Sequence, residues 1–207
     1  MSNDIEQVIF NVADALRVPV LVLALAALAF VLYELGAFGF ELLERRRRDF
    51  DRLQRAVGTA SEAIQGGNTQ LAEQAVSSVA WSKSMATTLR FIVDHARARD
   101  AGDLISKALA DFDFRSLRRL ERTRILVRFG PALGLMGTLI PLAPALAGLA
   151  KGDVAALSSN LRVAFSITVL GLLIGAVAFA VSLVRDRLYG QDLSDLQFVA
   201  SELVPES

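Results

Sequence analysis

Hydroxyl side chains lie inside two long uncharged stretches of the chain. Thr138 belongs to the stretch 129–150, and Ser166 and Thr168 belong to the stretch 163–184. A hydroxyl both donates and accepts hydrogen bonds, so in an apolar wall it can help a proton or a partly dehydrated cation to move. The same groups also bond to their own backbone or join two helices, and the residues alone leave both roles open.

Neither stretch contains a carboxylate. A proton relay or a sodium site normally needs one, because hydroxyls do not titrate near neutral pH. Glu34 is the only internal candidate, and we expect it at a membrane face, with a position facing a partner as the alternative. If the chain moves ions, the titrating acid must therefore come from another polypeptide.

The elements that position these hydroxyls are predicted to be helices that span a membrane. The chain has 207 residues, of which 53% are hydrophobic, and its mean hydropathy is positive. The apolar runs 18–40, 129–150 and 163–184 are each long enough to cross a hydrocarbon core of roughly 30 Å. The fold class that we predict is an all-α integral membrane protein with three transmembrane helices and a large helical cytoplasmic segment between the first two.

The remaining segments are polar. Residues 1–17 predict an amphipathic helix on the membrane surface, with a frayed terminal helix as the alternative. The cytoplasmic segment 41–128 predicts three or four helices, with breaks at Gly66-Gly67-Asn68 and at 100–103, the last helix leading straight into the second span. We predict that residues 151–162 form an outer link and that residues 185–207 form a cytoplasmic tail with a helical pattern.

Basic residues set the predicted orientation. Most of the 22 Lys and Arg residues fall in 41–128, where Arg45-Arg46-Arg47-Arg48 follows the first span and Arg124 and Arg128 precede the second. Positive charges gather on the cytoplasmic side, so the N-terminus is predicted outside the cell membrane and the C-terminus inside. We interpret the arginines as a stop-transfer and topology signal, with a docking surface for anionic lipid or a protein as the alternative.

Glycines and prolines predict how the second and third spans pack. Gly134 and Gly137 in one span, and Gly171 and Gly175 in the other, allow close helix approach. Pro141 and Pro144 predict a helix kink just beyond Thr138. With the two spans antiparallel, residue counting from the outer ends places Thr138 roughly 10 Å deeper than Thr168.

Composition argues against several function classes. Net charge is zero, there is no cysteine, and His95 is the single histidine. No general acid–base pair, phosphate-binding loop or cluster of metal ligands stands in the sequence. We therefore expect neither an enzyme nor a nucleic-acid-binding protein, and neither a cofactor nor a metal site.

Two motifs resemble the MotA/TolQ/ExbB proton-channel family. The run Gly130-Pro-Ala-Leu-Gly-Leu-Met-Gly-Thr-Leu139 is similar to that family's Pro-x-Leu-Gly-Leu-x-Gly-Thr signature. The run Ala164-Phe-Ser-Ile-Thr-Val-Leu-Gly-Leu-Leu173 is similar to its third-span pattern. Three spans with a large helical segment after the first resemble the TolQ/ExbB arrangement, whereas MotA-like members have four.

The resemblance implies a pentamer around a dimer of single-span ExbD/TolR/MotB-like partners, each bringing an aspartate. It also implies that Thr138 and Thr168 face the pore and that Pro131, Gly134, Gly137 and Gly171 are packing positions. Two functions follow as hypotheses. The first is an ion-conducting stator subunit of a membrane motor, with protons as the default ion and sodium left open. The second is a non-conducting membrane scaffold whose cytoplasmic helices dock partner proteins.

Overall fold

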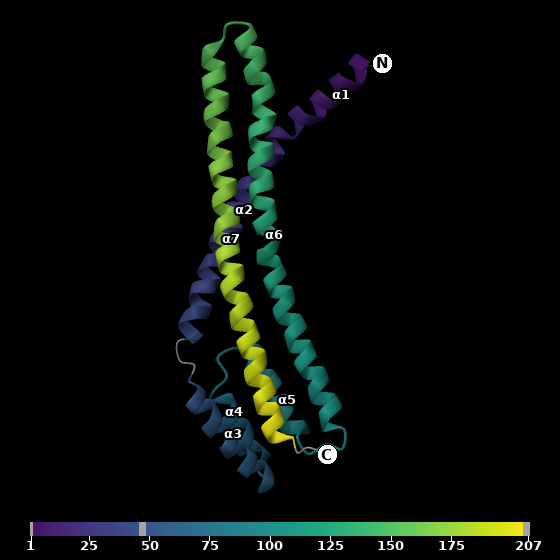
Figure 1. Ribbon diagram of the computed structural model, residues 1–207, viewed down its shortest axis with the longest axis vertical. Coiled ribbons are helices and arrows are strands. Elements are labelled where there is room, and N and C mark those ends of the chain that lie inside the picture. Colours follow the sequence, from purple (N-terminus) through teal and green to yellow (C-terminus); the bar gives the residue numbers. More distant parts are fainter. Residues whose placement is uncertain (1, 46–48, 205–207) are drawn as a thin grey trace. The chain divides into compact units, whose positions relative to one another are not determined.

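The computed structural model describes residues 2–45 and 49–204, and this part of the chain consists of helices and short turns without a strand (Figure 1). Arg46, Arg47 and Arg48 of the tetra-arginine run lie outside the described residues. The helices are α1 (Ser2–Ala15), α2 (Arg17–Arg45), α3 (Phe50–Gln65), α4 (Thr69–Ser77), α5 (Lys83–His95), α6 (Ala101–Ala150) and α7 (Val154–Leu203).

Within the described ranges, three helical stretches are long and apolar enough to cross a membrane. They are Asp4–Arg45, α6 and α7. The prediction of an all-helical chain with three candidate spans is confirmed. The side of the membrane on which each end lies remains a prediction.

Side-chain caps and one glycine explain where the short helices begin and end. Asp49, Asn68 and Ser82 each accept a hydrogen bond from a backbone N–H in the first turn of α3, α4 and α5, which satisfies a donor that the helix leaves free. Gly67 has φ +77°, a left-handed conformation that suits glycine, at the predicted break. The second predicted break falls where α6 begins, and a further break at 78–82 was not predicted.

Only residues 151–153 of the polar range 151–162 lie outside a helix. Gly152 takes φ +79° and turns the chain, and the Asp153 carboxylate accepts a hydrogen bond from the Ala156 backbone N–H at 2.9 Å. This cap starts α7 at Val154. Residues 154–162 are thus helical, because polar residues continue a helix once its first turn is capped. That this range lies outside the membrane stays a prediction.

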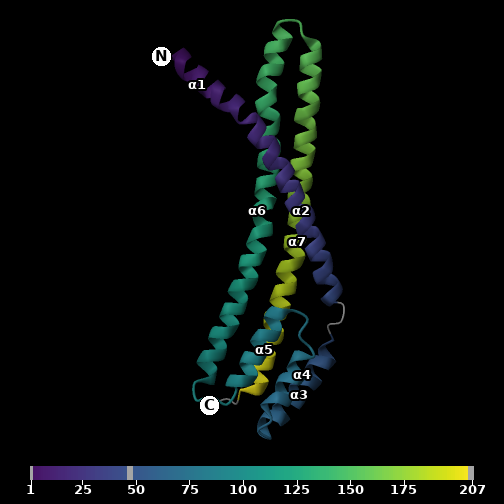
Figure 2. The ribbon, with the colours of Figure 1, turned by 180° about the vertical axis from the view of Figure 1, so that it is seen from behind.

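The chain divides into two compact units, which we describe separately. The first comprises Met1–Phe38 and Glu121–Leu183. In it, α6 and α7 lie side by side as an antiparallel hairpin, and α1 projects away from that hairpin (Figures 1 and 2). Val31 of α2 is buried against Leu126 of α6 and Ile174 of α7, so α2 packs across the hairpin.

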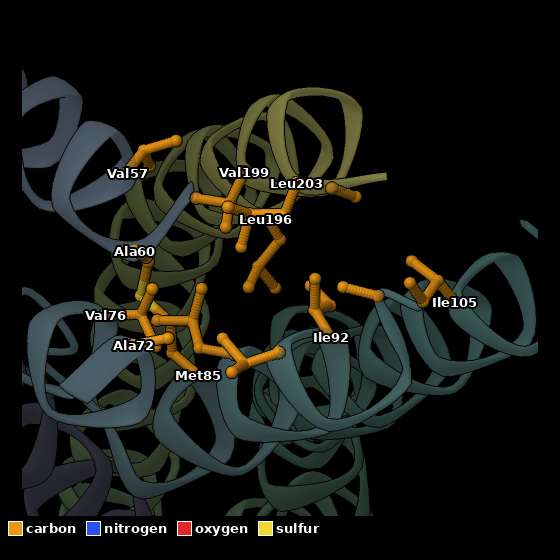
Figure 3. Packing of buried hydrophobic residues seen from close by; sticks show 14 of the residues in the cluster. Val57, Ala60, Ala72, Val76, Met85, Ile92, Ile105, Leu196, Val199 and Leu203 are labelled. Carbon is orange, nitrogen blue, oxygen red and sulfur yellow. The ribbon is translucent and has the colours of Figure 1, made fainter. Parts of the chain in front are cut away.

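The second unit comprises Gly39–Leu120 and Val184–Ser207. Its hydrophobic core is built by α3, α4, α5, the start of α6 and the end of α7. Figure 3 shows Leu196, Val199 and Leu203 of α7 turned toward Val76 and Met85 of the short helices. The helical pattern in the tail therefore corresponds to a core-facing stripe of α7.

Candidate functional site: the α6–α7 hairpin

Glycines let α6 and α7 touch backbone to backbone. A Cβ atom added to Gly130 would lie 2.6 Å from the Gly171 carbonyl oxygen, and one added to Gly171 would lie 2.8 Å from the Gly134 Cα. Real Cβ atoms do not approach other atoms so closely, so these positions accept only glycine without a shift of backbone. The contact is the close approach that small residues permit between membrane helices.

Gly137 and Gly175 extend this contact in both directions. A Cβ on Gly137 would lie 2.3 Å from Cγ2 of Ile167, and a Cβ on Gly175 would lie 2.9 Å from Cδ of Pro131. The structure thus places the predicted packing residues along one seam between α6 and α7. Bulky Ile167 and the Pro131 ring fill the space that the glycines leave.

The prolines of α6 do not interrupt it. Pro131, Pro141 and Pro144 all lie inside a helix that continues to Ala150. Each proline lacks the N–H that would bond to the carbonyl four residues earlier, so each frees one backbone acceptor. The helix is therefore continuous through Pro141 and Pro144. The kink expected there stays a prediction.

Thr168 lies on the seam itself. Its hydroxyl points to the Ala164 carbonyl oxygen at 3.2 Å and to the Gly134 carbonyl oxygen, on the other helix, at 3.4 Å. A Cβ on Gly134 would lie 3.4 Å from the Thr168 Cα. Thr168 is therefore level with Gly134 in the hairpin, and its hydroxyl oxygen is half-buried between two backbones.

Thr138 lies one turn of α6 beyond Gly134, and its hydroxyl donates to the Leu135 carbonyl oxygen at 2.8 Å. Because Thr168 is level with Gly134, the two threonines are separated along the hairpin by about 6 Å at 1.5 Å per residue. Thr168 lies farther from the 151–153 turn than Thr138, which is the opposite of the order expected from the sequence. The order is reversed because α7 begins at Val154 and not at 163, which places more residues between Thr168 and the turn.

Both threonines lie on the flank of the hairpin that faces away from α2. Leu133 of α6 faces α2, Gly134 faces α7, and Thr138 lies about 40° further around the helix in the same sense. On α7, Ile174 packs against Val31 of α2, and Thr168, six residues earlier, is rotated from it by about 120°. Ser166 is not brought to them, because two residues back along α7 is a rotation of about 200°, and its hydroxyl bonds to the Arg162 carbonyl oxygen on an exposed face.

The arrangement leaves acceptor capacity on each threonine. Both hydroxyl protons are directed to backbone carbonyls, which leaves lone pairs on the oxygens. Such an oxygen can accept a hydrogen bond from a protonated carboxyl group or coordinate a cation. Neither 129–150 nor 163–184 contributes a carboxylate of its own.

Glu34 does not serve this seam. Its carboxylate accepts a hydrogen bond from the Thr123 hydroxyl at 3.3 Å, and Thr123 is fully buried. Glu34 is thus directed to α6 of its own chain. The contact fixes the register between α2 and α6, with Glu34 level with Thr123.

A buried ion cluster in the second unit was not predicted from the sequence. Arg45 of α2 bonds to both carboxylate oxygens of Asp192 of α7, and Glu41 pairs with Arg185 at 3.3 Å. The Arg45 guanidinium also lies 3.7 Å from the centre of the Trp81 ring. Neither interpretation of the arginine run, a topology signal or a docking surface, includes this pairing of Arg45. The available clue is that Asp192 falls on the apolar stripe of Leu196 and Leu203.

Burial changes the acidity of two groups in this cluster. It raises the pKa of Asp192 to about 7, and the attraction of Arg45 opposes that rise without cancelling it. Burial, followed by the negative charge of Glu41, raises the pKa of Tyr189 to about 12. The cluster therefore contains a carboxyl group that titrates near neutral pH.

Comparison with known proteins identifies one family. The model of the MotA/TolQ/ExbB proton channel family matches residues 69–194, more than half of the chain. The matched range begins with α4 and includes α5, α6 and α7 as far as residue 194, with both threonines. The resemblance found in the sequence motifs is confirmed. No protein with a curated description matches the chain.

Proposed function

The chain belongs to the MotA/TolQ/ExbB proton channel family, and we propose that it is the ion-conducting subunit of an energy-transducing complex in the cell membrane. The observation that carries this proposal is the pair Thr138 and Thr168, which share one flank of a glycine-packed apolar hairpin. We propose that this flank lines the ion path and that the proton is the transported ion. The role is that of a channel or stator part, not of an enzyme.

The assembly that we propose contains copies of this chain, arranged as a pentamer, around a dimer of single-span membrane proteins. The N-terminus lies outside, and the second unit and the tail lie in the cytoplasm. Each single-span protein supplies the aspartate that this chain lacks in its second and third spans. The complex acts as a stator that turns ion flow into mechanical work on a load.

The physical basis is the cost of a charge in an apolar wall. A partner carboxyl group opposite Thr138 or Thr168 is neutral when protonated, and its O–H can donate to a threonine oxygen. The ionised form is expensive there and favours a wetter position. Alternate access of this group to the two membrane faces would couple protonation to movement of one ring within the other.

Reconstitution tests the proposal. The chain is co-expressed with a single-span protein that bears an aspartate just inside its span, and proton uptake is measured in vesicles containing the purified complex. We expect uptake only when both proteins are present and its loss on replacing the partner aspartate with asparagine. Uptake by the chain alone, or no uptake by an assembled complex, would exclude the proposal that this chain conducts protons with an acid supplied by the partner.

The alternative is a non-conducting scaffold, and one observation favours it. Each threonine hydroxyl is already bonded to backbone, as expected of residues that only join or bend helices. A scaffold of this kind would bind its partners and pass no ions whether or not the threonines were replaced.

A further inference from the structure

An apolar groove runs between α2 and α6 in the first unit, on the side of α6 away from the threonines. Its volume is about 370 Å³. The groove is lined by apolar side chains with a single charged residue, Arg122; the lining comprises Leu23, Ala26, Ala27 and Phe30 of α2 and Ile125, Leu126, Phe129 and Leu133 of α6.

Arg122 has no partner that would neutralise it within 2–45 and 49–204. It is exposed, and it makes no ion pair with a carboxylate in these ranges. Thr123, the next residue, donates a hydrogen bond to the Glu34 carboxylate, so this nearby acid is directed to Thr123 and not to Arg122. A positive charge therefore lies at one end of an otherwise apolar groove.

The depth of Arg122 matches the headgroup layer of a bilayer. It precedes the uncharged run, which starts at Phe129, by about 10 Å along the helix, and an arginine side chain can extend toward the interface. From Phe129 to Leu133 the groove continues about 6 Å past the start of the uncharged run, so its far end lies in the hydrocarbon. A molecule that fits has an anionic head at Arg122 and an apolar tail directed to the bilayer midplane.

We infer that this groove binds one anionic phospholipid, with its phosphate on the Arg122 guanidinium and an acyl chain along Phe129 and Leu133. The guanidinium of Arg122, unpaired within the described residues, favours a net negative headgroup over a zwitterionic one. Phosphatidylglycerol has the required chemistry. The site makes no use of the threonine flank, so its occupancy does not depend on ion flow.

The test is lipid retention by the purified full-length chain, without an ion gradient. Native mass spectrometry counts phosphatidylglycerol or phosphatidylcholine molecules bound per chain after detergent exchange. Arg122→Gln should weaken phosphatidylglycerol retention about tenfold, the effect of losing one charge-assisted hydrogen bond. Arg128→Gln removes another exposed arginine of the same helix, one that does not line the groove, and should change retention little.

A second pair of variants tests the tail. Ala26→Phe fills the groove and should displace the lipid, whereas Ala29→Phe adds the same ring to an exposed position of α2 outside the groove and should not. Equal retention by all variants, or equal retention of phosphatidylcholine, overturns the inference. If Ala26→Phe instead changed the oligomeric state with lipid retention intact, the occupant would be a second copy of the chain and the inference would be wrong.

Discussion

At the scale of single residues, the account depends on where hydroxyls and charges are placed. Thr168 bridges two backbones at the hairpin seam, and Thr138 lies one turn away on the same flank, whereas Ser166 points elsewhere. Residues of similar chemistry in one uncharged stretch therefore differ in expected function. Substitutions at the three positions separate the conduction hypothesis from a general effect of losing a hydroxyl.

Thr168→Val should leave the helices packed, because valine has nearly the same shape, but should reduce proton uptake by the partner complex at least about tenfold, as expected for one lost polar contact in a dry site. Thr168→Ser retains the hydroxyl and should preserve most of the flux. The measurement is the rate of vesicle acidification at equal amounts of assembled complex. A large loss with Ser166→Ala and none with Thr168→Val would contradict the assignment.

Asp192 predicts a pH dependence of stability. Its folded-state pKa of about 7 lies above its ordinary value of 3.8, so between these pH values the folded chain holds a proton that the unfolded chain has released. The free energy of unfolding should therefore fall as pH rises from about 4 to about 7 and level off above that. Thermal unfolding of the chain in detergent at pH 5 to 8 measures this.

Asp192→Asn should remove that part of the pH dependence, since asparagine does not titrate. Glu202→Gln is the matched control, because Glu202 is an exposed carboxylate near the end of the same helix, and this variant should retain the dependence. A profile that is the same for Asp192→Asn and the unchanged chain would show that Asp192 does not titrate in this range.

At the scale of helices, glycine contacts decide how α6 and α7 pack. A Cβ at position 171 would meet backbone atoms of Gly130 and Gly134 at 2.5 to 2.9 Å. Backbone cannot move aside as the end of a flexible side chain can. The hairpin, and with it the alignment of Thr168 with Gly134, therefore depends on these positions remaining glycine.

Gly171→Ala should destabilise the chain by about 1–3 kcal/mol, the usual cost of overpacking, with a corresponding fall in the melting temperature. Gly36→Ala, on α2, is the control, because nothing lies within 4 Å of a Cβ there and alanine favours a helix more than glycine does. It should leave the melting temperature unchanged or raise it. Equal effects of both variants would mean that the seam is not closely packed.

Several of these elements could be predicted from sequence because their signals are local. Uncharged length predicted the three helices that could cross a membrane, Gly66-Gly67-Asn68 predicted the turn before α4, and two motifs indicated the family. The pairing of Arg45 with Asp192 joins residues 147 positions apart, and helical periodicity does not show which distant charges will meet. The register error arose because a polar composition does not distinguish a link from a capped helix end.

At the scale of the whole molecule, the chain supplies an apolar hairpin with Thr138 and Thr168 on one flank and no carboxylate in 129–150 or 163–184. A chain of this kind needs a partner with a carboxyl group to move protons. The family to which the chain belongs consists of proton channel proteins, which supports an assembly in which the threonine flank faces that partner. The lipid groove on the other side of α6 would then face the surrounding bilayer.

The most direct test of this claim is disulfide formation between the chain and its single-span partner, since the chain has no cysteine of its own. Thr138→Cys, Thr168→Cys and Ser166→Cys are each combined with a cysteine at the partner's aspartate position, and oxidised complexes are measured by gel mobility. The account predicts cross-links from positions 138 and 168 and none from 166. Cross-links from 166 alone would place the threonines away from the partner and contradict it.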